Sequence, residues 1–173
     1  AKAAFDIEYE FPFGWQELEG IHNRSDYDLS RHSEFSGKDL TYLEDQSRER
    51  YLPYIVETSA GLTRSVLMVI SDAYDEEEVA EGDVRTVLRF HPSVAPITVA
   101  VFPLVKKDGL AELARKIETD LREDFTTFYD QSGAIGRRYR RQDEAGTPFC
   151  VTIDYETKEE NTVTLRFRDS MEQ

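Results

Sequence analysis

Apolar and polar residues alternate along residues 4–22 of the chain, as they do in β-strands. The apolar residues from Phe5 to Phe11 fall on one face of a first strand, and residues 15–21 form a second. Pro12 and Gly14 lie between the two runs and supply a turn. The pattern therefore predicts a β-hairpin at the start of the chain.

The next segments are more mixed. Residues 23–50 are polar with little periodicity, so we expect a loop that contains a short helix near residues 27–33. Residues 51–57 predict a strand, and the apolar spacing from Leu62 onward marks one face of a buried helix. Six acidic residues and one glycine fill residues 75–83, where we expect a solvated loop.

A second unit is expected after the two prolines of residues 91–96, because proline disfavours helix there. Residues 97–105 predict a strand, and apolar residues recur at helical spacing over residues 110–121. Further strands are predicted over residues 125–129, 149–154 and 162–167, and a helix over residues 135–144. The expected organisation is an α+β domain over residues 1–92 and an α/β domain over residues 93–173.

Composition narrows the function classes. The formal net charge of -14 repels polyanions, so any nucleic-acid contact requires a local basic surface. The single cysteine, Cys150, lies in an apolar run and is expected to be a buried, reduced thiol. No apolar stretch approaches the roughly 20 residues of a membrane span, and no secretory signal is present, so we expect a cytoplasmic protein without a membrane partner.

Residues 54–70 carry an apolar strand into an amphipathic helix and place polar groups at the junction. Glu57 and Ser59 are two residues apart on a strand, so both can face one pocket. Gly61 allows a ligand to approach the backbone, and Arg64 projects from the first helical turn as a planar cation. The helix dipole disfavours a cation there, which favours a binding role over a surface salt bridge. Ser59 could also cap the helix.

Carboxylates of the second predicted strand form another candidate site. Glu17 and Glu19 flank Leu18 and are expected to share one face of the strand. Glu19 is equally well interpreted as an exposed carboxylate. Arg24 could contact a phosphate or substrate, or pair with Asp26 or Asp28 as an ordinary surface residue.

Four of the 21 cationic residues fall within five positions of the predicted helix over residues 135–144: Arg137, Arg138, Arg140 and Arg141. At roughly 100° per residue these side chains sweep one side of the helix, while Ile135 and Tyr139 point into a core. The pattern predicts a basic patch on an acidic protein. A solvated helix whose arginines pair with nearby acids is the alternative.

Three sequence runs together resemble a known family. They are Phe-Gly-Trp-Gln-Glu-Leu-Glu-Gly-Ile at residues 13–21, Tyr-Ile-Val-Glu-Thr-Ser-Ala-Gly-Leu-Thr-Arg at residues 54–64, and Gly-Ala-Ile-Gly-Arg-Arg-Tyr-Arg-Arg-Gln-Asp-Glu at residues 133–144. The chain resembles the class II aminoacyl-tRNA synthetases, in particular glycyl-tRNA synthetases of the dimeric bacterial and eukaryotic type. The resemblance implies the C-terminal part of the antiparallel catalytic sheet with its third-motif helix, followed by an α/β anticodon-binding domain.

The first two class II motifs are expected ahead of these runs and are not present, so we expect a C-terminal fragment that is inactive alone. For the full-length protein the resemblance implies a homodimer that uses ATP and Mg²⁺ to activate glycine and transfers it to tRNA-Gly. It assigns catalysis to Arg64 and Glu17, and metal binding to Glu17. It assigns ATP binding to Glu17, Leu18, Gly61, Leu62, Thr63 and Arg64. It assigns glycine binding to Glu57, Thr58, Ser59, Ala60 and Gly61. It assigns tRNA binding to Arg137, Arg138, Arg140 and Arg141.

Two positions depart from the family pattern. Many members carry proline where this chain has Thr58, whose side chain should face away from the pocket. Phe167 stands where a charged residue is expected, which leaves a tRNA contact at that strand open. Two other functions remain: a non-catalytic synthetase-like module, such as a polymerase accessory subunit, and another class II synthetase with a related anticodon domain. The presence of Glu57, Ser59, Gly61 and Arg64 together favours the enzyme over the non-catalytic module.

Overall fold

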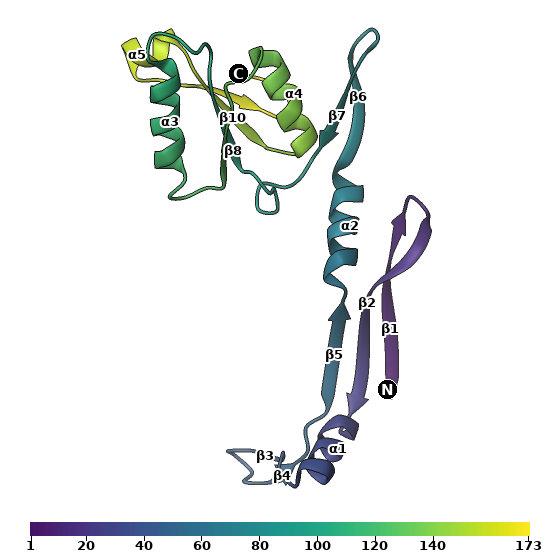
Figure 1. Ribbon diagram of the computed structural model, residues 1–173. Helices are drawn as coiled ribbons and strands as arrows, with labels where there is room; N and C mark the ends of the chain where they lie inside the picture. The colour runs from purple at the N-terminus through teal and green to yellow at the C-terminus, as the bar shows by residue number, and fades with distance from the viewer. The chain divides into compact units, whose positions relative to one another are not determined.

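The computed structural model describes all of residues 1–173, which form two compact units, residues 1–71 and residues 72–173 (Figure 1). The structural division precedes the expected boundary at residues 92 and 93, because the segment over residues 74–88 packs within the second unit. No helix has both the length and the apolar character needed to cross a membrane.

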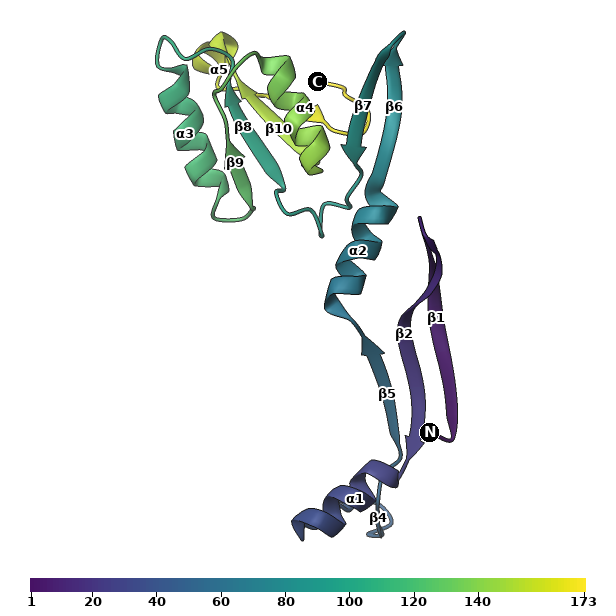
Figure 2. The ribbon, with the colours of Figure 1, turned by 45° about the vertical axis from the view of Figure 1, so that its right-hand side comes forward.

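The first unit is built on a three-stranded antiparallel sheet with the order β1-β2-β5. Its strands are β1 (Ala3–Phe11), β2 (Gly14–Ser25) and β5 (Ile55–Ala60). Gly14 closes the β1–β2 turn with a φ of 108°, a backbone conformation that favours glycine. Figure 2 shows the long β1–β2 hairpin, with β5 beside β2. The predicted hairpin is confirmed.

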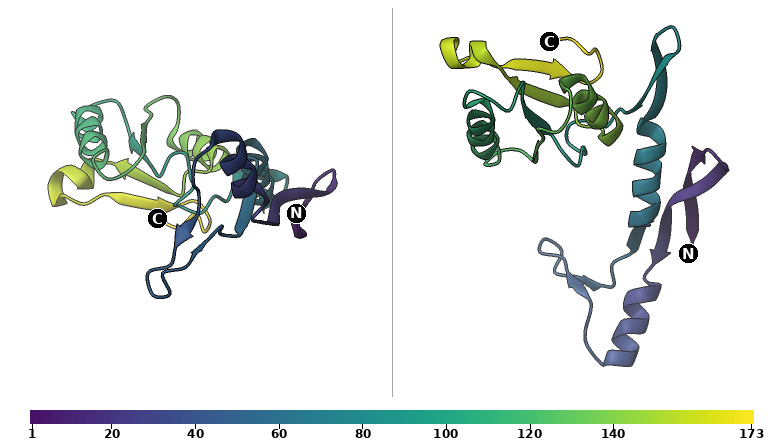
Figure 3. Two further views of the ribbon diagram at one scale, coloured as in Figure 1. Left: turned by 90° about the horizontal axis from the view of Figure 1, so that it is seen from below. Right: turned by 45° about the horizontal axis from the view of Figure 1, so that its top comes forward.

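Between β2 and β5 the chain forms a helix, α1 (Tyr27–Ser36), and two short paired strands, β3 (Tyr42–Leu43) and β4 (Arg50–Tyr51). Figure 3 shows this segment from two further directions. The short helix expected near residues 27–33 is confirmed and extends to Ser36, where Gly37 ends it in the left-handed conformation.

The helix α2 (Leu62–Ala73) begins where it was predicted, directly after β5 and Gly61. The expectation that it is buried is wrong within this chain. Leu62 is 79% exposed and Val66 is 51% exposed, and only Ala73 is buried. The amphipathic pattern specified the helix, but no element of the first unit packs extensively against its apolar face.

The second unit begins with an antiparallel hairpin formed by β6 (Tyr74–Ala80) and β7 (Asp83–Leu88). The expected solvated loop over residues 75–83 is therefore wrong. Two arginines, one in β7 and one directly after it, form ion pairs with acidic residues of β6. Arg85 pairs with Glu77, and Arg89 pairs with Asp75 and Glu77. Glu77 lies directly opposite Arg85 in the strand pair, and Arg89, the residue after β7, adds a second cation, so the acidic run can form a strand.

The remainder of the second unit is a four-stranded mixed sheet with the order β11-β10-β8-β9. Its strands are β8 (Val99–Pro103), β9 (Thr127–Tyr129), β10 (Phe149–Ile153) and β11 (Thr164–Phe167). Its helices are α3 (Leu110–Leu121), α4 (Ile135–Ala145) and α5 (Tyr155–Glu160). β8 runs parallel to β9 and β10, and β11 is antiparallel to β10. The α/β character predicted for this region is confirmed, and α5 was not predicted.

Two cores cover the two faces of this sheet. The core on one face, beneath α3, comprises Val99, Val101, Leu110, Ala114, Val151 and Ile153. The core on the other face, beneath α4, comprises Ala100, Phe102, Tyr139 and Cys150. Successive residues of β8 and β10 belong to different cores, as expected for strands buried on both faces (Figure 1).

Candidate active site and nucleic-acid interface

The end of β5 presents the predicted glycine-binding residues on the sheet of the first unit. Glu57 pairs with His22 of β2, and Ser59 pairs with Gly20. Residues two apart on a strand share a face, so Glu57 and Ser59 lie on one face, as predicted, and Thr58 lies on the other. Ala60 follows at the end of the strand, and Gly61 connects it to α2.

A β-bulge in the β1–β2 pair changes the expected placement of the β2 carboxylates. Ile7 pairs with Glu19 and Glu8 pairs with Glu17, so Leu18 is the extra residue. Ile7 and Glu8 are consecutive and point to opposite faces, and paired residues share a face. The expectation that Glu17 and Glu19 share one face is therefore wrong.

The bulge places Glu17 with the polar residues of β5. Asp6 is on the same face of β1 as Glu8, and it pairs with Gly20, which in turn pairs with Ser59. Glu17, paired with Glu8, thus shares a sheet face with Ser59. Without the extra residue in β2, alternation would carry Glu17 to the other face.

Arg64 makes the contact that joins the two predicted catalytic residues. Its guanidinium Nη1 donates a hydrogen bond of 2.5 Å to the main-chain carbonyl of Glu17, 47 positions away in the sequence. Leu62 and Thr63 precede Arg64 in the exposed first turn of α2. The turn after β5 therefore brings a planar cation beside the strand that carries Glu17, an arrangement suited to a nucleotide phosphate or an aromatic base.

Arg24 is held by two carboxylates. It donates hydrogen bonds of 2.5 and 2.9 Å to Asp28 and forms a 3.3 Å ion pair with Glu57. The hydrogen bond to Asp28 raises the pKa of Arg24 and holds the pKa of Asp28 below its usual range. Of the alternatives for Arg24, the structure shows pairing with Asp28, together with a contact to the candidate glycine site.

Glu17 is an exposed single carboxylate, and no group of three or more histidines, cysteines or acidic residues could hold a metal ion. Mg²⁺ commonly binds one or two protein carboxylates and completes its shell with phosphate oxygens and water. The donors of this face therefore fit a metal delivered with a nucleotide better than a preformed protein cage.

The four arginines of α4 differ sharply in accessibility. Arg137 is exposed, and its side chain makes no hydrogen bond or ion pair. Arg140 pairs with Asp83 at 2.7 Å, and Arg141 pairs with Asp130 at 2.5 Å. Three arginines thus remain at the surface.

Arg138 is the exception among the α4 arginines. It is only 2% exposed and donates to the main-chain carbonyls of Pro103 at 2.6 Å and Leu104 at 3.3 Å. These bonds fasten α4 to the end of β8. The expectation that all four arginines form one accessible patch is therefore wrong, because α4 turns one of them towards the sheet.

The sequence analysis missed a buried network behind α4. Asp143 is fully buried and accepts hydrogen bonds from Arg85 at 3.2 Å and from both terminal nitrogens of Arg166 at 2.8 and 3.0 Å. Tyr139 lies in the core beside it and exchanges a 2.6 Å hydrogen bond with Thr152, which confirms the core interpretation of that tyrosine. A signal was available: Asp143 lies four positions after Tyr139, on the same helix face.

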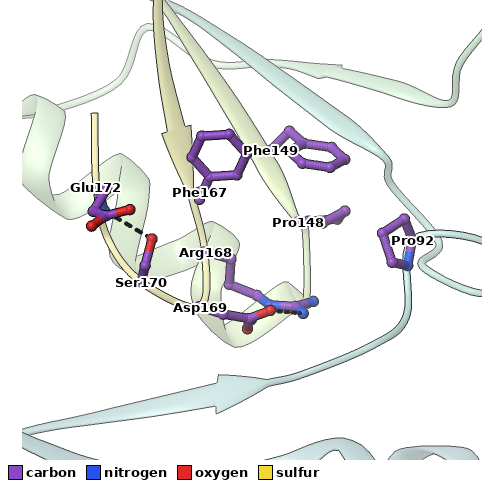
Figure 4. A pocket seen from close by; sticks show the side chains of 8 residues that line it. All are labelled: Pro92, Pro148, Phe149, Phe167, Arg168, Asp169, Ser170 and Glu172. Carbon is purple, nitrogen blue, oxygen red and sulfur yellow. Dashed lines mark hydrogen bonds and ion pairs between the residues drawn. The ribbon is translucent and has the colours of Figure 1, made fainter.

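A surface hollow of about 320 Å³ lies in the second unit (Figure 4). It is lined by Pro92, Pro148, Phe149, Phe167, Arg168, Asp169, Ser170 and Glu172. Phe149 and Phe167 meet edge to face with ring centroids 5.9 Å apart. Because Arg166 contacts α4, its neighbour Phe167 points to the opposite sheet face. The hollow is therefore separate from the exposed arginines of α4.

Comparison with known proteins shows what the chain is similar to. Residues 98–173 match the anticodon binding domain family. The whole chain is 71% identical over 178 residues to a glycine–tRNA ligase of Treponema denticola, of which it covers 40%. It is 63% identical to the glycine–tRNA ligase of Borreliella burgdorferi, covering 39% of that protein, and 55% identical to that of Treponema pallidum, covering 43%. Over its whole length the chain is therefore similar to part of these glycine–tRNA ligases.

The predicted resemblance to glycine–tRNA ligases is thus confirmed over all of this chain, and the predicted anticodon-binding domain is confirmed within residues 98–173. The chain spans about two-fifths of the length of the curated glycine–tRNA ligases it matches. The α4 helix and the buried Asp143 lie within the anticodon-binding match, whereas Arg64 and Glu17 precede it.

Proposed function

We propose that the complete protein containing this chain is a glycine–tRNA ligase. It activates glycine with ATP to form glycyl-adenylate and transfers the glycyl group to tRNA-Gly in the cytoplasm. The observation that carries the proposal is 71% identity to a glycine–tRNA ligase across every part of the chain. The hydrogen bond from Arg64 to the strand that carries Glu17 supports it, because the contact brings together the two residues that the family resemblance assigns to catalysis.

The nucleotide site is proposed at the junction of β2, β5 and α2. Arg64 stacks on the adenine, and Leu18, Gly61, Leu62 and Thr63 shape the surface around the nucleotide. Glu17 would hold a Mg²⁺ ion bound together with the nucleotide. The ion, when bound, supplies positive charge to the phosphates during attack by the glycine carboxylate.

The glycine site is proposed on the neighbouring part of the same sheet face. Glu57 and Ser59 accept hydrogen bonds from the glycine ammonium, and Thr58, Ala60 and Gly61 complete the surrounding strand end. Arg24 already contacts Glu57 at 3.3 Å and keeps that carboxylate in place when no substrate is bound. A substrate without a side chain is selected when the site leaves no room for one.

The surface of α4 is proposed to contact tRNA through Arg137, Arg140 and Arg141, with Arg138 holding the helix from beneath. We further propose that the sheet of residues 1–71 is part of a class II antiparallel catalytic sheet in a homodimer. The exposed apolar face of α2 supports this, because such a face is normally packed against other elements. The relatives are also much longer than this chain.

The test is glycine-dependent exchange of labelled pyrophosphate into ATP by the complete protein, repeated with Arg64→Ala. Exchange in the wild type that is lost in the variant supports the synthetase and this half of its site. The control is Arg122→Ala, which removes an exposed arginine directly after α3 and should retain exchange. No exchange in the complete wild-type protein, with tRNA or DNA binding intact, would favour the non-catalytic synthetase-like module instead.

A further inference from the structure

The first residue of β7 pairs with an arginine of the proposed tRNA surface. Asp83 accepts a 2.7 Å hydrogen bond from Nη2 of Arg140, and both side chains are partly exposed, at 58% and 36%. We propose that Asp83 is a built-in competitor of RNA phosphate for Arg140 and that it lowers the affinity of this surface for RNA. This inference rests on the proposed contact between α4 and tRNA.

The position of Asp83 is fixed by the residue two places further along the same strand. Arg85 lies on the same face of β7 as Asp83, and its side chain is fully buried. It donates to Asp143 of α4 at 3.2 Å and to the main-chain carbonyl of Arg168 at 2.9 Å. The start of β7 is thus fastened to α4, and the carboxylate of Asp83 is held next to Arg140 in advance.

The three exposed arginines of α4 consequently differ in how readily each can bind a phosphate. Arg137 has no partner and can bind one directly. Arg141 is held by Asp130, which is only 14% exposed, and also donates 2.8 Å to the main-chain carbonyl of Ser132. Arg140 becomes available only when a phosphate displaces the solvated carboxylate of Asp83, and that exchange reduces the net gain of the contact.

The neighbouring hairpin residue Glu81 provides a matched control. Glu81 is exposed and belongs to the same β6–β7 turn, and no ion pair or hydrogen bond involves its side chain. Asp83→Asn and Glu81→Gln each remove one negative charge from this hairpin with little change in side-chain size. Long-range repulsion of RNA falls similarly in both variants, whereas only Asp83→Asn frees Arg140.

The experiment measures the dissociation constant of tRNA-Gly for the complete protein in moderate salt. We expect about two- to five-fold tighter binding for Asp83→Asn than for Glu81→Gln, the size of an exposed ion pair. In an Arg140→Ala background the advantage of Asp83→Asn over Glu81→Gln should disappear. Equal affinities for the two single variants, or an advantage that persists without Arg140, would overturn the proposal.

A different result would contradict the proposal that α4 contacts tRNA. If the wild-type protein binds tRNA-Gly and Arg137→Ala does not weaken binding, α4 is not the tRNA surface. If Arg137→Ala weakens binding while Asp83→Asn and Glu81→Gln remain alike, the tRNA surface stands and the competitor role of Asp83 is wrong.

Discussion

Arg166 and Asp143 form a buried, bidentate ion pair with N–O distances of 2.8 and 3.0 Å. Arg85 donates to the same carboxylate from β7. Replacing Asp143 with alanine would leave two buried guanidinium groups without their shared anion, so we expect a loss of about 3–5 kcal/mol in the free energy of unfolding. Urea denaturation of the wild type and the variant measures this difference in the free energy of unfolding. Glu144→Ala, which alters the next, exposed residue of α4, should cost far less.

Two glycines of the α4 region should respond oppositely to alanine. Gly146 ends α4 with a φ of 79°, and an added Cβ would overlap the Phe90 ring and lie 3.0 Å from the Leu88 carbonyl oxygen. We expect Gly146→Ala to lower the free energy of unfolding by about 1–3 kcal/mol. Gly136 lies inside the helix with no atom near the added group, so Gly136→Ala should raise it by about 0.4–1 kcal/mol. Thermal unfolding of the pair would refute this explanation if both substitutions had the same sign.

The stability of the second unit should depend on acid through Glu118. Hydrogen bonds from Arg122 and Thr127 hold the pKa of this carboxylate below its usual value. A lowered folded-state pKa stabilises the fold above the unfolded-state pKa, and the stabilisation is lost as pH falls through the folded-state pKa. Glu118→Gln should therefore cost about 1–2 kcal/mol at neutral pH, and the cost should shrink below about pH 4.5.

The matched variant for this pH experiment is Glu112→Gln, which replaces an exposed carboxylate on the same helix. Its difference from wild type in the free energy of unfolding should stay small across the whole range. A Glu118→Gln difference that did not narrow in acid would mean that the cost comes from packing and not from the charged carboxylate.

Cys150 should be chemically silent in the folded protein. The thiol is buried beneath α4, and burial raises its pKa to about 12. Thiolate is the reactive form, so a disulfide reagent at pH 8 should not label the native protein. Unfolding in guanidinium should release one reactive thiol per chain. Stoichiometric labelling before unfolding would contradict the buried placement.

Local sequence patterns predicted most helices and strands well. Which of their faces are buried depends on packing between elements, which these patterns do not specify. The apolar stripe over residues 110–121 specified α3 with the observed ends, because one helix face is buried against the sheet. The stripe of α2 equally specified a helix, yet its burial depends on packing partners that this sequence pattern does not encode. The hairpin of residues 74–88 was missed because its inward residues Asp75 and Glu77 are charged, and only their arginine partners reveal the alternation.

In the candidate sites, too, features set within one element were predictable, whereas features set by contact between two elements were not. The spacing of Glu57 and Ser59 placed both on one face, since alternation is a local property of a strand. The bulge beside Glu17 is a property of two paired strands, so one strand's pattern could not reveal it. Likewise, the arc swept by the α4 arginines was predictable, but the burial of Arg138 depends on how the helix is rotated against β8.

The salt bridge between Arg85 and Asp143 crosses the boundary of the anticodon-binding match but lies inside one compact unit. The family match begins at residue 98, whereas the compact unit begins at residue 72. A polypeptide that started at residue 98 would retain Asp143 and Arg166 but lose Arg85 and the β6–β7 hairpin that carries it. The segment that matches the anticodon-binding family is therefore smaller than the segment needed to pair every charge around the buried Asp143 carboxylate.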